Sequence, residues 1–569
     1  MPDLVIGSRR ASPGRALRAT GLLVALGATA LVVAWFIYRR SVAYDVPDGE
    51  PVSAPIEVEQ VDGVGVGLRW SEARLTHVGG LTVVRAAGEP FAIGAAHGRL
   101  LGPRLPATLA GFGPSIDALA GDGGWFGFTQ AMRKDWRLRF VDDGITDRHR
   151  RGLAGLVRGA AQSGVDRSYQ EVLRTATVLD IGQPSATTAE VQTRNLARAL
   201  TVVAPQAGAA TDRLWVGRSF ALPGLVDGGD GLGAPVLFIV KPTGRQAWAG
   251  VGWPGLTGVV TGVNAAGLAI MVHPTRTRDV RASRSAVPIA LIAREILEEC
   301  TDLDAAIKKL EATPTLGAAA FVIVDGARGR WAVVDRSPTR VGVRRAPASR
   351  AVGDVLVSGA FADDPENDRQ LRTAATVARA ARAERLAAIP PADAAAVATL
   401  LRDRRGADEA VLPIGHRAAL DDVAAAHVVV LDPASLQLWI GDGPGAGARL
   451  RGFDLRHELR GEGDRPVPPA DLAPDPEADR GAAEQVRAAR RELRAARGAL
   501  NRGAPGRAAE AVARARALAP LLPEAWVVAG AVAQARGDRA GALAAWRRWF
   551  ELGADDPGLA ATLSSAVAP

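Results

Sequence analysis

The sequence predicts an α+β protein in which a large domain lies between an apolar N-terminal helix and an all-helical tail. Strand-like and helix-like segments follow one another without regular alternation, which favours sheets covered by helices over a doubly wound parallel sheet. An uncharged apolar run lies near the N-terminus, and residues 480–569 are rich in Ala, Arg and Leu. These observations divide the chain into an anchor, a main domain and a tail.

The apolar run Ala19–Tyr38 predicts a transmembrane helix. Twenty helical residues rise about 30 Å, which is the thickness of the hydrocarbon core of a bilayer. Arginines precede the run, so residues 1–18 are expected in the cytoplasm and the bulk of the chain outside it. A cleaved secretory peptide is the alternative, but aromatic residues and arginines follow the run instead of a small-residue cleavage site.

The rest of the chain is divided by two proline-rich segments. Residues 39–57 are predicted to form a stalk, residues 58–460 the main domain, residues 461–479 a linker and residues 480–569 the tail. Apolar segments bounded by Gly, Pro or charge predict strands at Leu81–Arg85, Val236–Val240, Ala247–Val251, Ala269–Val272, Ala319–Val324 and Trp331–Val334. Apolar residues at three- and four-residue spacing predict helices at Ile289–Glu299, Asp304–Glu311, Asn367–Ala388 and Pro391–Arg402.

The tail contains an internal repeat of thirty-four residues, the tetratricopeptide period. Five positions recur at this distance: Gly503, Ala508, Val512, Leu518 and Pro523 reappear as Gly537, Ala542, Trp546, Leu552 and Pro557. The alternative is an Ala-rich helical hairpin with a coincidental period. Because such repeats bind proteins, we expect a protein partner here, or packing of the tail on the main domain.

Composition excludes several classes of function. The formal charge is +8, but nearly all basic residues are arginines, and no basic stripe, zinc finger or recognition helix accompanies them. We therefore expect no nucleic-acid partner. Cys300 is the only cysteine, which excludes an intrachain disulfide and a multi-cysteine metal site. No His and carboxylate cluster has metal-ligand spacing and no Gly-rich loop suits a phosphate, so we expect neither a metal nor a cofactor.

Several segments of the main domain together resemble the penicillin acyltransferase family, the N-terminal-nucleophile hydrolases related to isopenicillin-N acyltransferase. The segments are Gly88–Gly102 with its His-Gly pair, Gly217–Gly224, Trp253–Ile270, Phe321–Pro338, Leu401–Asp403 and His427–Pro444. The resemblance covers about 380 residues and implies a four-layer αββα fold. It also implies a chain that cuts itself before a cysteine, which then attacks an amide or thioester bond while its own amino group serves as base.

The sequence departs from this family at the nucleophile. By spacing from Gly217-Arg218, the nucleophile should open a strand near Ala199, and no cysteine lies in that region. Thr201 is the closest hydroxyl and Thr211 lies farther along, whereas Cys300 is expected to pack as a small apolar residue on a helix.

Neighbouring positions have changed as well. Ser219 and Ala221 stand where the family has Asn and Asp, Ala265 where an acidic residue is usual, and Val357–Phe361 replace a polar loop. Several positions around the expected nucleophile have changed together. This favours a loss of selection for catalysis over the exchange of one nucleophile for another.

The polar residues that remain in the family-like segments and near the expected nucleophile are the candidates for a catalytic or substrate-binding site. Thr201, Asn264 and His97 are the catalytic candidates, and Arg218, Ser219 and His273 are candidates for the lining of a substrate pocket. Each has a structural alternative: packing is favoured over catalysis for His97, and Asn264 is suited to a turn before Gly267.

Two functions follow. The first is a membrane-anchored protein with a degenerate acyltransferase or amidohydrolase site, which binds an acylated amine, a peptide or an acyl-CoA, or acts as a scaffold. The second is an active enzyme with a threonine nucleophile. Whether the chain is an enzyme is left open by the sequence.

Overall fold

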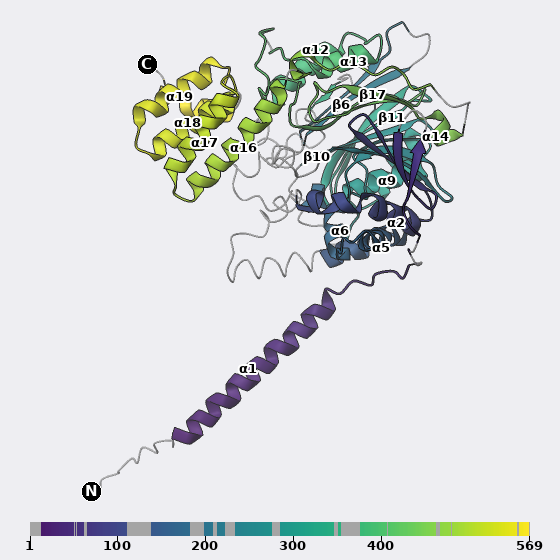
Figure 1. Ribbon diagram of the computed structural model, residues 1–569, viewed down its shortest axis with the longest axis vertical. Coiled ribbons are helices and arrows are strands. Elements are labelled where there is room, and N and C mark those ends of the chain that lie inside the picture. Colours follow the sequence, from purple (N-terminus) through teal and green to yellow (C-terminus); the bar gives the residue numbers. More distant parts are fainter. Residues whose placement is uncertain are drawn as a thin grey trace.

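The computed structural model describes residues 13–49, 52, 54–61, 65–110, 138–181, 198–208, 213–221, 234–275, 285–345, 351–353, 376–406, 408–461, 467–479, 481–554 and 557–567. Within these residues the main domain contains two β-sheets and the helices that cover them (Figure 1). The mixed α and β content predicted from the sequence is therefore confirmed.

The larger sheet has eleven strands in the described part of the chain, in the order β1-β2-β3-β4-β7-β8-β9-β10-β11-β12-β13. Its strands are β1 (Glu57–Val61), β2 (Gly65–Trp70), β3 (Ala73–Val78), β4 (Leu81–Gly88), β7 (Val236–Pro242), β8 (Trp248–Gly252), β9 (Thr261–Asn264), β10 (Leu268–Thr275), β11 (Ala318–Asp325), β12 (Arg330–Arg336) and β13 (Val341–Arg345). β4 and β7 pair in parallel, whereas the other neighbours are antiparallel.

The smaller sheet has six antiparallel strands in the same described residues, in the order β14-β5-β6-β15-β16-β17. They are β14 (Ala351–Gly353), β5 (Arg198–Pro205), β6 (Leu214–Ala221), β15 (Ala425–Asp432), β16 (Gln437–Gly441) and β17 (Leu450–Asp454). β5 and β6 form a regular ladder in which Ala199 faces Phe220 and Thr201 faces Arg218. This register brings the expected nucleophile strand beside the Gly-Arg motif.

The two sheets pack face to face, and helices cover their outer faces. Side chains such as Val83, Val203 and Val429 form an apolar core between the sheets. A second core joins the outer face of the larger sheet to helices, and a third does so for the smaller sheet. In the described part of the main domain the helices are α2 (Pro90–Leu101), the 3₁₀ helix η1 (Gly102–Arg104), α5 (Asp147–Gln162), α6 (Tyr169–Ala176), α7 (Val178–Ile181), α9 (Ile289–Glu299), α10 (Leu303–Ala312), α12 (Thr376–Ala387), α13 (Ala394–Leu401) and α14 (Arg456–Arg460). The layers are thus helix, sheet, sheet and helix, which is the order that the family resemblance implies.

Helices α2 and α5 approach each other through glycines. A Cβ built on Gly94 or Gly98 would lie 2.0 or 2.1 Å from a backbone carbonyl oxygen of α5, and one built on Gly155 or Gly159 would lie 2.1 Å from a carbonyl oxygen of α2. Real Cβ atoms essentially never come so close to other atoms. Gly94 and Gly98 of the segment Gly88–Gly102 therefore serve the close packing of two helices.

The strand and helix segments named from the sequence are present as strands and helices with shifted ends. For the expected helix Asn367–Ala388, the structure describes α12, and residues 367–375 lie outside the described residues. Thr211 and Val357–Phe361 lie outside them as well. The domain boundaries remain predictions.

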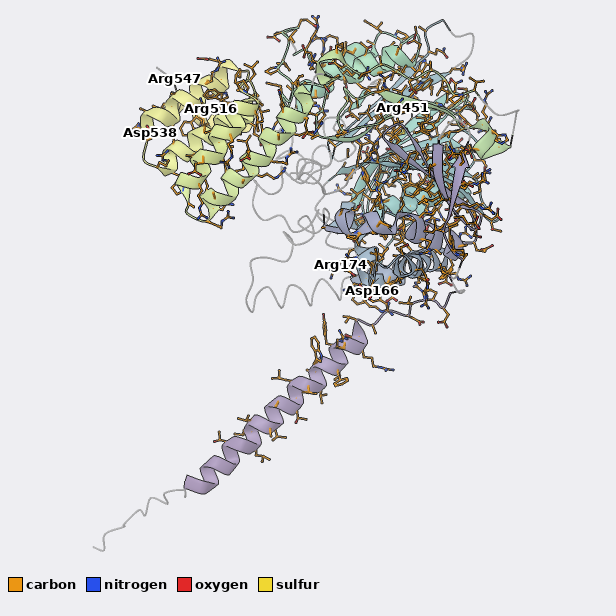
Figure 2. The ribbon with its side chains drawn as sticks, viewed as in Figure 1. Asp166, Arg174, Arg451, Arg516, Asp538 and Arg547 are labelled. Carbon is orange, nitrogen blue, oxygen red and sulfur yellow. The ribbon has the colours of Figure 1, made fainter. Side chains whose placement is uncertain are left out.

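Helix α1 (Pro13–Ser41) extends away from the main domain, and the described side chains of its apolar run contact no other part of the chain extensively (Figures 1 and 2). Residues 20–41 have a mean hydropathy of 2.2 and none of the most apolar window is buried. By length and composition this helix is able to cross a membrane, and a signal sequence near the N-terminus would have the same properties.

The tail consists of α16 (Ala482–Asn501), α17 (Pro505–Leu518), α18 (Pro523–Ala535), α19 (Arg539–Glu551) and α20 (Pro557–Val567), preceded by the short α15 (Pro476–Asp479). The positions that recur after thirty-four residues lie at equivalent places in successive pairs of helices. Gly503 and Gly537 have positive φ angles in the turns before α17 and α19, and Pro523 and Pro557 begin α18 and α20. The assignment to the tetratricopeptide family stays a prediction.

The tail packs on a loop of the main domain. Val423 joins the apolar core of the tail, and Arg490 of α16 donates a hydrogen bond to the carbonyl oxygen of Gly415. Glu524 at the start of α18 forms ion pairs with Arg490, Arg497 and the loop residue Arg417. A single buried carboxylate thus joins two tail helices to the main domain.

Candidate functional site

Ala199 is the second residue of β5 and carries a buried methyl group where the sequence resemblance places the nucleophile. It is 3% exposed, and its cross-strand partner is Phe220 on β6. Side chains of a strand alternate between its two faces. Leu200 and Val202 belong to the core under α12 and α13, so Ala199 and Thr201 face the larger sheet.

The hydroxyl of Thr201 lies in a polar cluster between the two sheets. Thr201 Oγ1 is 2.8 Å from His273 Nε2 on β10 and accepts a hydrogen bond of 3.1 Å from Arg218 Nη1 on β6. A second hydrogen bond of 2.5 Å joins Arg218 Nη2 to the carbonyl oxygen of Val272. Thr201 and Arg218 are 0% exposed and His273 is 3% exposed. The structure therefore brings together three residues that the sequence suggested.

The electrostatics of this cluster hold His273 neutral. Burial, followed by the positive charge of Arg218, lowers the pKa of His273 well below its usual value, although a hydrogen bond with the backbone of Ala199 acts in the opposite direction. Burial also lowers the pKa of Arg218 to about 9, so its guanidinium stays charged at neutral pH. Because Arg218 donates to Thr201 Oγ1, the hydroxyl proton of Thr201 is available to the neutral Nε2 of His273.

A second group of buried side chains surrounds Phe220, beside Ala199. The ring of His427 on β15 stacks on Phe220 with 5.1 Å between centroids, and Trp253 lies 6.3 Å from Phe220 and 5.6 Å from His427. Thr261 Oγ1 is 2.9 Å from His427 Nε2. His427 and Trp253 were not expected in the site, although each is the first residue of a segment that carries the family resemblance.

Asn264 and Ser219 are not part of the cluster. The amide of Asn264 donates to the carbonyl oxygens of Leu297 and Cys300, and its Oδ1 accepts from the backbone of Ala266 and Leu268. It therefore stabilises the turn between β9 and β10, as its structural alternative predicts. Ser219 faces Leu200 across the ladder, so it points toward α13 and away from Thr201. Its assignment to the pocket is corrected by the two-residue period of a strand.

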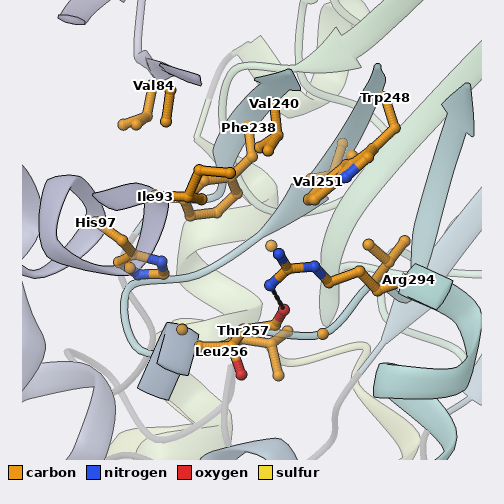
Figure 3. A pocket seen from close by; sticks show the side chains of 17 residues that line it. Val84, Ile93, His97, Phe238, Val240, Trp248, Val251, Leu256, Thr257 and Arg294 are labelled. Carbon is orange, nitrogen blue, oxygen red and sulfur yellow. Dashed lines mark hydrogen bonds between the residues drawn. The ribbon is translucent and has the colours of Figure 1, made fainter. Parts of the chain in front are cut away.

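His97 lies on the opposite side of the larger sheet. Its Nε2 accepts a hydrogen bond of 2.8 Å from the backbone N–H of Gly255, and its ring lies 4.9 Å from that of Phe238. Burial and the nearby charge of Arg294 lower the pKa of His97 to about 3. A cavity of about 30 Å³ separates His97 from Arg294, which donates a hydrogen bond to the carbonyl oxygen of Thr257 (Figure 3). The space suffices for a water molecule and not for a substrate.

Cys300 ends α9 and is buried, as expected of a packing residue. Burial raises the pKa of its thiol to about 11, which makes it a poor nucleophile. Among the described residues, no group of three or more His, Cys, Asp and Glu is placed to hold a metal ion.

Comparison with known proteins identifies the family that the main domain resembles. Residues 236–423 match the family model of acyl-coenzyme A:6-aminopenicillanic acid acyl-transferase. The matched region contains His273 and Asn264, whereas Ala199, Thr201 and Arg218 precede it. The acyltransferase resemblance expected from the sequence is thus confirmed at the family level. No curated protein matches the chain in sequence.

Solved structures with a low similarity to this chain include hydrolases. An N-acylethanolamine-hydrolyzing acid amidase ortholog from Caenorhabditis elegans is 11% identical with a TM-score of 0.30, and the alignment covers 41% of this chain and 93% of that one. A mutant conjugated bile acid hydrolase from Clostridium perfringens is 10% identical with a TM-score of 0.30, covering 48% of this chain and 96% of the hydrolase.

Proposed function

We propose that this chain is a membrane-anchored binding protein built on an acyltransferase-like fold, with a site that no longer transfers acyl groups. The observation that carries this proposal is the buried methyl of Ala199, which lies at the strand position of the expected nucleophile. A methyl group supplies neither a nucleophile nor a proton. The family match supports an acylated amine, a peptide or an acyl-CoA as the ligand.

Cleavage that would make Thr201 a chain terminus is disfavoured by the ladder around it. Arg198, Ala199 and Leu200 all precede Thr201 within β5 and pair with β6, and Leu200 also pairs with Gly353 of β14. Releasing these three residues would break paired strand structure on both sides. This geometry supports an uncut chain.

The second candidate is an amidohydrolase in which Thr201 acts as nucleophile without chain cleavage. The short contact between Thr201 Oγ1 and His273 Nε2 favours it, because a neutral imidazole within hydrogen-bond distance is able to accept the hydroxyl proton. The positive charge of Arg218 would stabilise the resulting alkoxide. Complete burial of all three side chains opposes this candidate.

Intact-mass measurement separates the two candidates. We expect the purified full chain to remain uncut and to gain no mass from a β-lactone, which acylates nucleophilic hydroxyl and thiol groups. An adduct that is absent from Thr201→Val and kept by Thr201→Ser would instead support the hydroxyl nucleophile. Two fragments that meet between Leu200 and Thr201 would show self-processing and contradict the binding function.

We further propose that α1 is retained as a single membrane anchor, with the main domain outside the cytoplasm and a protein partner bound by the tail. The unburied apolar run of α1 and the repeated positions of the tail support these assignments. The expected result is that the full chain stays in the membrane fraction after carbonate extraction and starts at its original N-terminus. A shortened, carbonate-soluble chain would identify α1 as a signal sequence.

A further inference from the structure

The segment that follows α1 lies against the main domain. The ring of Tyr44, three residues after the last residue of α1, is 5.5 Å from the ring of Tyr169 on α6. Farther along, Val52 is 5% exposed within the core under the larger sheet, and the carbonyl oxygen of Ala54 accepts a hydrogen bond of 3.0 Å from the indole of Trp70. Contacts along this segment therefore fix its path over the main domain.

Tyr169 is a rigid docking point for Tyr44. Its side chain is buried, and its hydroxyl donates a hydrogen bond of 2.6 Å to Asp142 Oδ1. The start of α6 is closed by a capping box, in which the side chain of Ser168 accepts from the backbone of Glu171 and the side chain of Glu171 accepts from the backbone of Ser168. Tyr44 consequently packs on a ring whose position is set by the fold.

The tether between α1 and this docking point is short. Three residues span at most about 11 Å, even when fully extended. In the proposed anchor, Tyr38 is near the outer end of the apolar run, where aromatic rings lie at the level of the headgroups. Tyr44 is then at most about 15 Å from the level of Tyr38, so α6 is held close to the lipid surface.

The surface around the docking point carries an excess of positive charge. Residues 147–176, which include α5 and α6, contain six arginines and three acidic residues. Arg151 and Arg158 are exposed on α5 about two turns apart, and neither forms an ion pair with a residue that the structure describes. The phosphates of lipid headgroups attract arginines that lie close to a bilayer surface. Both the tether and the charge therefore suit a lipid surface.

We propose that Tyr44 holds the face formed by α5 and α6 against the phosphate headgroups of the membrane that α1 crosses. This inference rests on the proposed anchor and goes beyond it, because it assigns the main domain one orientation on the lipid. The two helices lie on the side of the main domain nearest to α1, whereas α12 lies at the opposite end (Figure 1). Asp166, just before α6, is likewise on the side of α1 (Figure 2).

Fluorescence quenching by lipids with a nitroxide on the headgroup tests this orientation. The full chain is reconstituted in vesicles of phosphatidylcholine and phosphatidylglycerol, with a fluorophore on Asp166→Cys or, as the matched control, on Ile389→Cys. Asp166 is exposed, Ile389 is 73% exposed and follows α12, and the native Cys300 is buried and therefore shielded from the label. We expect the label at position 166 to lose most of its fluorescence and the label at position 389 to keep it.

A second pair of variants tests the role of Tyr44. In the chain labelled at position 166, Tyr44→Ala should restore part of the fluorescence, whereas Val46→Ala, at a residue that is 43% exposed in the same segment, should leave the quenching unchanged. Full quenching in Tyr44→Ala would overturn the docking. Equal quenching at positions 166 and 389, in a chain that stays with the vesicles in carbonate, would overturn the orientation and leave the anchor standing. Release of the chain by carbonate would overturn both.

Discussion

Gly98→Ala is expected to destabilise the main domain by about 3 kcal/mol or more. The added Cβ would lie 2.1 Å from the carbonyl oxygen of Leu156 and 2.6 Å from the backbone nitrogen of Ala160 on α5. Overpacking in a core costs about 1–3 kcal/mol when side chains are able to adjust, and backbone atoms adjust less. Urea denaturation of the full chain, followed by the fluorescence of its tryptophans, measures the free energy of unfolding.

Gly506→Ala is the matched control for this substitution. Gly506 is also helical, and a Cβ built there would meet nothing within 4 Å. The control should leave stability unchanged or raise it by about 0.5–1 kcal/mol, because alanine is the better helix former. A Gly98→Ala variant as stable as this control would show that α2 and α5 do not depend on close glycine contact.

The interface of α2 and α5 also shows which parts of the sequence could be interpreted in advance. The amino-acid sequence shows the glycine spacing at Gly94 and Gly98, and it also indicates the helix that carries them. The partner helix could not be identified, because α5 begins forty-six residues after α2 ends and contact between helices that are distant in sequence is a property of the fold. Packing was already the favoured interpretation of His97, and in the structure both His97 and Gly98 take part in packing.

The same reasoning applies to the candidate site. The family resemblance made Thr201 and Arg218 candidates, and the antiparallel pairing of β5 and β6 places them opposite each other. The two-residue period of β6 would have excluded Ser219, which directly follows Arg218 and must face the other side. His273 lies on β10 in the other sheet, so its contact with Thr201 required the packing of the two sheets. Sequence patterns predicted several strands of this domain, but not which side chains meet where the two sheets pack together.

Glu524 offers a test of the attachment between the tail and the main domain. Its carboxylate is 2.7 Å from Arg497 Nη1, 3.4 Å from Arg490 Nε and 3.6 Å from Arg417 Nη2. Burial raises the pKa of Glu524, but the three arginines outweigh burial and lower it below the usual value of 4.5. Removing one partner of a buried ion pair costs about 3–5 kcal/mol, because the remaining charges are left buried without compensation.

We therefore expect Glu524→Gln to lower stability by about 3–5 kcal/mol at neutral pH, with faster amide exchange in α16 and in the loop around Arg417. Glu492→Gln is the control: Glu492 pairs with Arg514 at the tail surface, where an ion pair contributes about 1 kcal/mol or less. Because the pKa of Glu524 is lowered in the folded chain, its contribution is complete above pH 4.5 and is lost as the pH falls below that value. The stability difference between the unaltered chain and Glu524→Gln should shrink over that acidic range. A difference that stays constant down to the acid unfolding of both chains would show that the carboxylate is not ionised in the fold, and that apolar packing around Val423 holds the tail in place.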